Sequence, residues 1–223
     1  LLAPRGEKKL DALLAADDPR AAVRALAPVE LFELVHDVGL DGCTELLALA
    51  APEQLRACID LDGWDKDQVD LVHVRPWLAA LLATNFEHVG AVWQTIDAEL
   101  RALLLQRMAF IQDVSDGSDI DDSHGLSVYV TPDRWYALGL RGSDEEASLT
   151  YRLIEDLYRA DPDVARHTIM SALSEPPAEL EEMSFRWRSN RMADEGYVEF
   201  TEALQIFAPL ELADLRGGAA AAP

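Results

Sequence analysis

Two proline-led helix starts, 24 residues apart, constrain this chain more than any other feature. Pro28-Val29-Glu30-Leu31 opens one apolar helix pattern, and Pro52-Glu53-Gln54-Leu55 opens another. Proline suits the first turn of a helix, and short connections make consecutive helices antiparallel neighbours. Short amphipathic helices that recur in this way stack into superhelical arrays, which usually bind partners. The sequence therefore predicts a mainly α, armadillo-like fold built on a short-helix superhelical repeat.

The helical pattern continues beyond this repeat. We expect a helix to begin near Pro76, and helical periodicity to run from Val74 to Ile111. Asn85 and Gly90 are expected to interrupt this stretch, because both residue types weaken helices or mark their ends.

The period changes after an acidic loop. Leu126, Val128 and Val130 alternate with polar residues, which is the period of a strand. Thr131-Pro132-Asp133 is typical of a turn, and 135–138 suits a return strand. The sequence therefore predicts a small β-hairpin, inserted near 126–140.

Helices return in the C-terminal third. Ser143 and Glu146 form a capping box, and Asp161-Pro162 starts a helix whose apolar positions are Val164, Ile169, Met170 and Leu173. A long helix is expected over 178–195, followed by a last helix with Tyr197, Phe200, Leu204 and Phe207. We thus divide the chain into a helical-repeat domain (1–111), an acidic loop and hairpin insertion (112–142), helices packed on the repeat (143–210) and a tail or linker (211–223).

The charge of the chain restricts its partners. Its 41 acidic and 19 basic residues give a formal net charge of −22. Nucleic acids and anionic membranes are themselves polyanions, so neither is an expected partner. A protein partner, including a basic one, or a divalent cation is compatible with this charge.

Cysteine use and hydropathy indicate a compartment. Cys43 and Cys58 are the only cysteines, and both lie in apolar helix patterns, which favours a reducing cytoplasm over a disulfide framework. No apolar run reaches the roughly 18 residues that span a bilayer, so we expect no membrane insertion.

Two acidic segments are candidate cation sites. Asp62, Asp65 and Asp67 cluster after the second repeat helix, and the loop 113–123 includes Asp119 and Asp121. The loop does not fit a calcium-binding EF-hand in either register. The alternatives are a solvated acidic surface or weak Mg²⁺ binding through carboxylates and water; no other cofactor is expected.

Arginines form the remaining candidate site. Arg188 and Arg191 lie one helical turn apart and could grip a carboxylate or phosphate of a partner, or could belong to internal salt bridges. The sequence contains no HExxH, GxSxG, P-loop or GxGxxG motif, so we expect no catalytic site.

Residues 28–82 resemble the N-terminal helical-repeat domain of MgtE-type magnesium transporters. The matching segments are Leu-Phe-Glu-Leu-Val at 31–35, Glu-Leu-Leu-Ala-Leu at 45–49 and Pro-Glu-Gln-Leu at 52–55. Flagellar motor-switch proteins have similar superhelices. The whole chain also resembles an uncharacterised bacterial family built on that domain, through Leu-Asp-Gly-Trp at 61–64, the turn 131–133 and residues 156–162. The resemblance implies a cytoplasmic, mainly α fold.

These observations lead to one principal hypothesis and two alternatives. The first is a non-enzymatic cytoplasmic module that binds a protein partner through an acidic surface. The second is a magnesium-sensing domain, as the transporter resemblance implies. The third is an enzyme of undefined class, built around Arg188, Arg191 and nearby carboxylates.

Overall fold

A computed structural model describes residues 5–120, 125–198 and 204. The chain divides into two compact units, Leu1–Arg186 and Trp187–Pro223. The second unit includes the last turns of helix α11.

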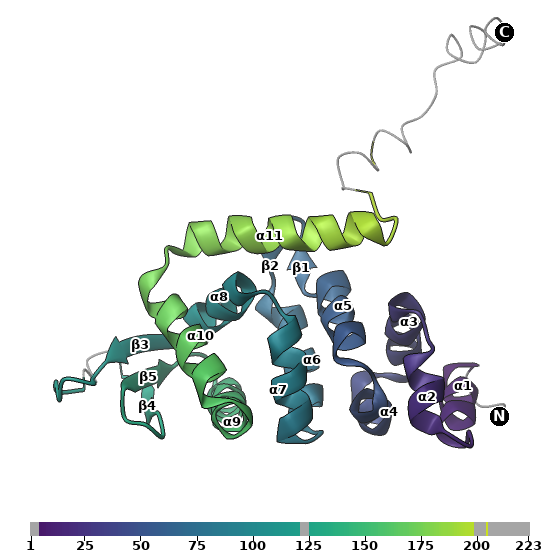
Figure 1. Cartoon of the computed structure of the whole chain (residues 1–223), viewed down its shortest axis with the longest axis horizontal. Coiled ribbons are helices and arrows are strands. Elements are labelled where there is room, and N and C mark those ends of the chain that lie inside the picture. Colours follow the sequence, from purple (N-terminus) through teal and green to yellow (C-terminus); the bar gives the residue numbers. More distant parts are fainter. Residues whose placement is uncertain (1–4, 121–124, 199–203, 205–223) are drawn as a thin grey trace, which may run out of the picture. The chain divides into compact units, whose positions relative to one another are not determined.

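The first unit is mainly helical, as the sequence predicts. Its N-terminal part consists of α1 (Arg5–Leu14), α2 (Pro19–Arg24), α3 (Pro28–Val38), a 3₁₀ turn η1 (Leu40–Cys43), α4 (Thr44–Leu49), α5 (Pro52–Asp62), α6 (Leu71–Leu82), α7 (Phe86–Thr95) and α8 (Ala98–Met108). A two-residue hairpin, β1 (Trp64–Asp65) and β2 (Gln68–Val69), joins α5 to α6. Figure 1 shows these elements along the molecule.

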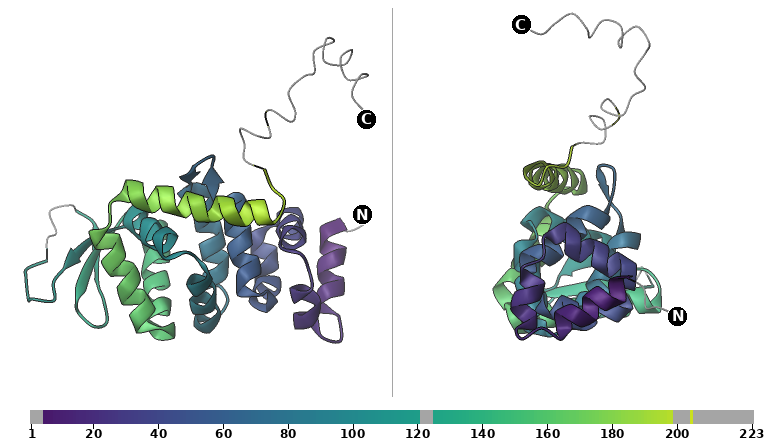
Figure 2. Two further views of the ribbon diagram at one scale, coloured as in Figure 1. Left: turned by 45° about the horizontal axis from the view of Figure 1, so that its top comes forward. Right: turned by 90° about the vertical axis from the view of Figure 1, so that its right-hand side faces the viewer.

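Alternate helices of this part pack against one another. Helix α1 contacts α3, α3 contacts α5 and α5 contacts α7. Helix α2 contacts α4, and α4 contacts α6. The result is two rows of short helices, seen from other directions in Figure 2.

The two proline-led starts use the same local device. Pro28 and Pro52 occupy the first turns of α3 and α5. Three residues into each helix, a side-chain oxygen accepts a hydrogen bond from the backbone N–H that precedes the proline: Glu30 from Ala27 and Gln54 from Ala51. This bond satisfies a donor that the start of a helix leaves unpaired.

Side chains from neighbouring helices satisfy the carbonyls at helix ends. Such carbonyls lack a partner within their own helix. The donors are long polar side chains: Arg24 bonds Leu49 O, Gln54 bonds Val23 O and Leu26 O, Arg152 bonds Leu82 O, and Gln106 bonds Ala172 O and Glu175 O. These bonds fix the position of each helix relative to another helix that lies two or more elements away in the chain.

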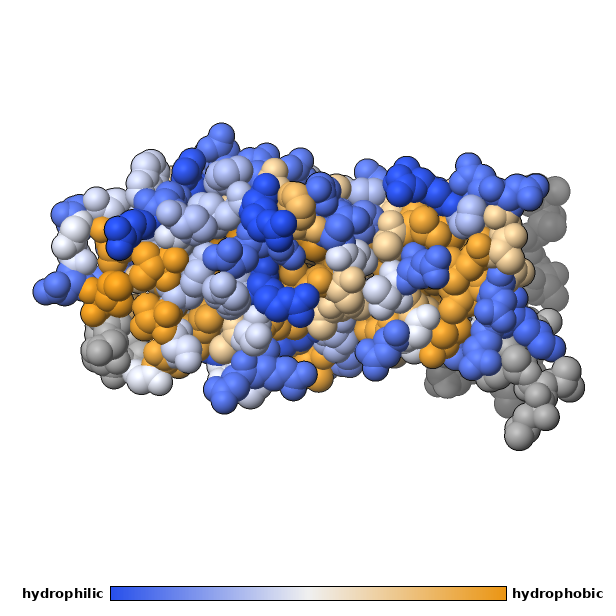
Figure 3. Space-filling model, turned by 90° about the horizontal axis from the view of Figure 1, so that it is seen from below, coloured by the Kyte–Doolittle hydropathy of each residue, from blue (hydrophilic) through white to orange (hydrophobic). Residues whose placement is uncertain are grey.

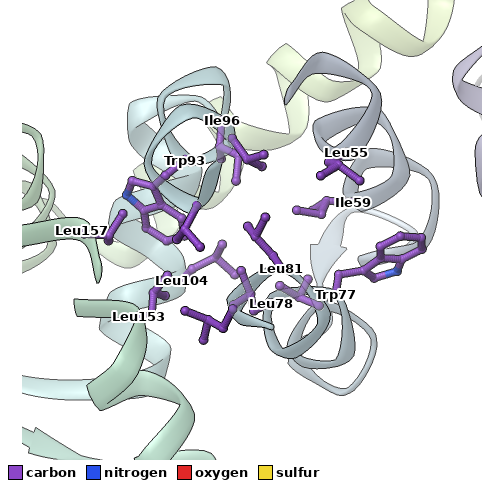
Figure 4. Packing of buried hydrophobic residues seen from close by; sticks show 14 of the residues in the cluster. Leu55, Ile59, Trp77, Leu78, Leu81, Trp93, Ile96, Leu104, Leu153 and Leu157 are labelled. Atoms are coloured by element: carbon purple, nitrogen blue, oxygen red, sulfur yellow. The ribbon is translucent and has the colours of Figure 1, made fainter. Parts of the chain in front are cut away.

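The core is continuous through the first unit. Figure 4 shows Leu55 and Ile59 of α5 facing Leu78 and Leu81 of α6, with Trp93 close to Leu157 on the opposite side. Trp93 is 1% exposed, and Leu78, Leu104 and Leu153 of the same core cluster are as fully buried. Each fully buried leucine or isoleucine contributes about 1.5–3 kcal/mol relative to an exposed one, so packing of these apolar faces holds the rows together.

A three-stranded antiparallel sheet follows α8. Its strands are β3 (Ala109–Asp113), β4 (Ser127–Val130) and β5 (Tyr136–Leu140), in the order β3-β5-β4. The predicted hairpin is therefore confirmed as β4 and β5. The prediction of helix up to Ile111 is wrong, because residues 109–113 pair with β5 and Ile111 lies opposite Leu138.

Two further predictions need correction. Helix α6 begins at Leu71 rather than near Pro76, because Asp70 caps it by accepting from Val72 N at 2.8 Å. Gly90 lies inside α7 and does not interrupt it. A Cβ at Gly90 would lie 2.4 Å from Ala160 Cβ, so the glycine lets α7 approach α9 closely.

The C-terminal helices are α9 (Asp144–Ala160), α10 (Pro162–Ser174) and α11 (Pro177–Asp194). The predicted capping box at Ser143 and Glu146 and the cap at Asp161 are confirmed. Helix α9 contacts α6 and α7, and α10 contacts α8 and α9. The predicted last helix falls largely on residues outside the described part, as do residues 211–223.

Candidate interaction site

The first acidic segment does not bring its three carboxylates to one point. Asp62 accepts a hydrogen bond from Trp77 Nε1 at 2.8 Å, and its Oδ2 lies 3.8 Å from His36 Nε2. Asp65 ends β1 and Asp67 lies in the β1–β2 turn, and both are exposed. Within the described ranges, no group of three or more His, Cys, Asp or Glu side chains could hold a metal ion.

The acidic loop uses its carboxylates locally. Asp113 Oδ1 accepts from Ser115 N, and Asp116 Oδ1 accepts from Ser118 N. These hydrogen bonds lower the pKa of both carboxyl groups. Asp119 is exposed, and its backbone oxygen accepts from Gln112 Nε2. Asp121 lies outside the described residues, so Mg²⁺ binding by this loop stays a prediction.

Arg188 and Arg191 are half-buried on α11, in the second unit. They are one turn apart, as the sequence predicts. Their role as partner or anion contacts stays a prediction.

Exposed large apolar side chains gather near the three-stranded sheet. Residues 5–120 and 125–186 contain eight of them: Val29, Val72, Ile120, Val128, Trp135, Tyr151, Met170 and Leu173. The last six belong to the sheet, its loops or the adjoining helices α9 and α10. Figure 3 shows one face, on which apolar surface is dense near the end that carries β3–β5 and near α1–α3, with hydrophilic side chains between.

Helix α10 contributes an exposed stripe. Arg166, Met170 and Leu173 lie at positions i, i+4 and i+7, which share one helix face. Met170 is 49% exposed and Leu173 is 43% exposed. The residues of α10 that face the core are instead Ala165, Ile169 and Ala172.

A hydrogen-bond network holds the β4–β5 turn against this stripe. The carboxylate of Asp133 accepts from Thr131 Oγ1 at 2.6 Å, Tyr158 OH at 3.1 Å and Arg166 Nε at 2.7 Å. Burial alone would raise the pKa of Asp133, but the hydrogen bonds outweigh it and lower the pKa. The network therefore keeps a carboxylate at the turn and fixes the position of Arg166.

Trp135 completes the stripe. Its ring lies 5.1 Å from the Arg166 guanidinium carbon, in a cation–π contact, and yet the residue is 49% exposed. An aromatic ring that is held in place and still half exposed suits contact with a partner, because Trp and Arg dominate interface energies. We call Trp135, Arg166, Met170 and Leu173 the α10 stripe.

The stripe ends at a groove of about 400 Å³. The lining residues come from α8, the sheet, α10 and the start of α11: Gln106, Arg107, Ala109, Phe110, Ile111, Arg141, Ala172, Leu173 and Pro177. Arg107 donates to Val69 O and to Glu181 Oε1. The volume lies within the roughly 300–1,000 Å³ range of binding pockets.

Sequence reasoning missed this site. Trp135 was expected to begin a strand, and Arg141 had no motif around it. The spacing of Met170 and Leu173 could have indicated it. A helix that is apolar on more than one face can bury only one of these faces against the core, so the apolar residues of another face are exposed.

A family model covers residues 1–222, and its description is a family of unknown function (DUF6178). The chain belongs to this family. Comparison of the DUF6178 chain with curated proteins and with solved structures finds no match. None of its described helices combines the length and apolarity required to cross a membrane.

Proposed function

We propose that this DUF6178 chain is a non-enzymatic, cytoplasmic module that binds a protein partner through the α10 stripe. One observation carries the proposal: six of the eight exposed large apolar side chains in the described part of the first unit lie at its sheet-bearing end. Solvent contact with such a group is unfavourable, and a contiguous apolar surface marks an interaction site. Burial by a partner would stabilise the complex.

The acidic charge supports a protein as the partner. A net charge of −22 repels nucleic acid and anionic lipid, and it speeds encounter with a protein that carries a basic region. Asp65 and Asp67 are exposed and available for such steering. Cys43 and Cys58 are both free thiols, which fits a reducing cytoplasm.

Affinity capture with the full chain tests the proposal. Met170→Asp combined with Leu173→Asp places two charges on the stripe without touching the core, so the fold stays intact. We expect the double variant to capture about one tenth as much partner as the unaltered chain, or less, because central apolar side chains contribute most of the binding energy of an interface.

Val72→Asp is the matched control. Val72 is 73% exposed on α6 and belongs neither to the α10 stripe nor to the lining of the groove. The control should capture as much partner as the unaltered chain. If both variants lost the same amount of captured partner, or if the double variant captured as much as the unaltered chain, binding through the α10 stripe would be contradicted.

Magnesium sensing is a second candidate, favoured by the resemblance of residues 28–82 to the MgtE N-terminal domain. We infer that Asp65 at the end of β1 and Asp67 in the β1–β2 turn, both exposed, would be the carboxylates involved. Melting in millimolar MgCl₂ and in NaCl of equal ionic strength tests this. A melting temperature that is higher in MgCl₂ than in NaCl, and that no longer differs in the double variant Asp65→Asn, Asp67→Asn, supports magnesium sensing. Equal melting temperatures of the unaltered chain in the two salts contradict it.

A further inference from the structure

We propose that the groove beside the α10 stripe binds a peptide segment in which an apolar side chain lies next to a carboxylate. This inference rests on the proposed function and specifies the chemistry of the partner. The apolar side chain would enter the groove, and the carboxylate would pair with Arg141.

The apolar half of the argument comes from the groove walls. Phe110 of β3, Leu173 of α10 and Pro177 of α11 line it. Leu173 and Pro177 are exposed, so an incoming side chain can remove apolar surface from water at this point. A volume of about 400 Å³ accommodates more than one side chain of an extended segment.

The charged half comes from Arg141. Arg107, the other guanidinium in the groove, bonds a backbone oxygen and a carboxylate. Arg141 is exposed, and no side-chain hydrogen bond or ion pair joins it to any described residue. An arginine at an apolar wall pairs well with a carboxylate, because the guanidinium can donate two parallel hydrogen bonds.

The composition of this site differs from that of the chain as a whole. Acidic residues outnumber basic ones by 41 to 19, yet two arginines and no carboxylate line the groove. Arginines elsewhere, such as Arg24 and Arg152, donate to helix-end carbonyls and so hold the fold together. A basic segment would meet the Arg141 guanidinium, a like charge, and a purely polar anion would leave the apolar wall of the groove in water. The lining therefore matches an acidic and apolar segment.

A second groove at the same end has a similar composition. It measures about 440 Å³, and the lining residues are Val114, Ser118, Ile120, Val130, Thr131, Pro132 and Arg134. Arg134 is exposed at the β4–β5 turn, beside the apolar residues Val130 and Ile120. The pairing of an exposed arginine with apolar residues thus recurs near the sheet.

Selection from a displayed library of random peptides, with the full chain as bait, tests the inference. We expect the selected peptides to be enriched in Asp or Glu next to Leu, Ile, Phe or Met. A synthetic copy of a selected peptide should bind Arg141→Gln about tenfold more weakly than the unaltered chain, as expected for loss of a charge-assisted hydrogen bond.

Arg20→Gln is the control, since Arg20 is also exposed but lies on α2. It should leave peptide affinity unchanged. Selection of basic peptides, of no peptides, or of acidic peptides that bind Arg141→Gln equally well would overturn the inference. Sedimentation that shows a dimer dispersed by Arg141→Gln would also overturn it, by identifying a second copy of the chain as the occupant.

Failure of this inference is separable from failure of the proposed function. If the capture experiment depends on Met170 and Leu173 while selected peptides ignore Arg141, the stripe binds a partner but the groove does not bind an acidic segment. If neither experiment shows dependence, both proposals are wrong.

Discussion

Replacement of Gln54 should lower the free energy of unfolding by more than the loss of one ordinary polar side chain would. The side chain is 5% exposed and makes three hydrogen bonds. Its Nε2 donates to Val23 O at 3.1 Å and to Leu26 O at 2.8 Å, and its Oε1 accepts from Ala51 N at 2.8 Å. One residue of α5 therefore satisfies backbone groups at the end of α2 and at its own helix start.

Gln54→Leu keeps most of the volume and removes all three bonds. At about 1 kcal/mol net for each bond, the free energy of unfolding should fall by roughly 3 kcal/mol. Val23 O still accepts from Leu26 N, but Leu26 O loses its side-chain donor, and this raises the cost further because a partly buried carbonyl has lost its partner. For a chain of this length, about 3 °C per kcal/mol makes the melting temperature roughly 10 °C lower.

Thermal melting followed by circular dichroism measures the effect, and Glu30→Leu is the matched control. Glu30 occupies the equivalent position of α3 but is exposed and bonds only Ala27 N in this way, at 3.1 Å. The control should lose about 1 kcal/mol or less. If Gln54→Leu melts within 2 °C of the unaltered chain, the hydrogen bonds of Gln54 to Val23 O and Leu26 O do not stabilise the helical array.

Three further predictions concern packing and titration. Gly90→Ala should cost about 1–3 kcal/mol in a denaturant titration despite alanine's higher helix propensity, because its Cβ would meet Ala160; Ala160→Gly in the same chain should restore most of the loss. Burial lowers the pKa of His88, whose Nε2 contacts Leu47 O. The free energy of unfolding should therefore be constant above about pH 6.5, the ordinary histidine pKa, and fall as the pH drops below it. His88→Gln should remove that fall, and an unchanged pH profile in this variant would contradict the assignment to His88. Burial, with the nearby Asp62 charge, raises the pKa of Cys58 to about 12, so an aromatic disulfide reagent at pH 8 should label it only on unfolding, and rapid labelling of the native chain would contradict its burial.

Local signals predicted much of the fold. The capping box at Ser143 and Glu146 and the cap at Asp161 depend on residues within one turn, so sequence alone locates them. The alternation of residues 126–130 predicted β4 for the same reason.

Features that depend on distant residues were not predictable in this way. Residues 109–111 continue an apolar helical pattern, and only pairing with β5 makes them a strand. A glycine such as Gly90 resembles a helix break until the approach of Ala160 is known. The sequence does not distinguish the buried apolar residues of α10 from the exposed ones. Met170 stays exposed because α8 and α9 pack against another face of the helix.

The candidate site was harder to predict than the fold. Charge alone drew attention to Asp62, which instead bonds Trp77, and to exposed carboxylates that do not converge. The α10 stripe and its groove combine residues from α8, β3, the β4–β5 turn and α10, so no local motif marks them. Exposure of apolar side chains is a tertiary property, and the sequence shows only their spacing.

Site-specific photo-crosslinking tests the central claim most directly. A photoreactive phenylalanine analogue at position 173 of the full chain, expressed in its native cells, should yield a covalent adduct with a discrete protein partner. The same residue at position 72, which is more exposed but belongs neither to the α10 stripe nor to the groove, should not. An adduct specific to position 173 is the predicted result, and equal labelling at both positions, or labelling at position 72 alone, would contradict binding through the α10 stripe.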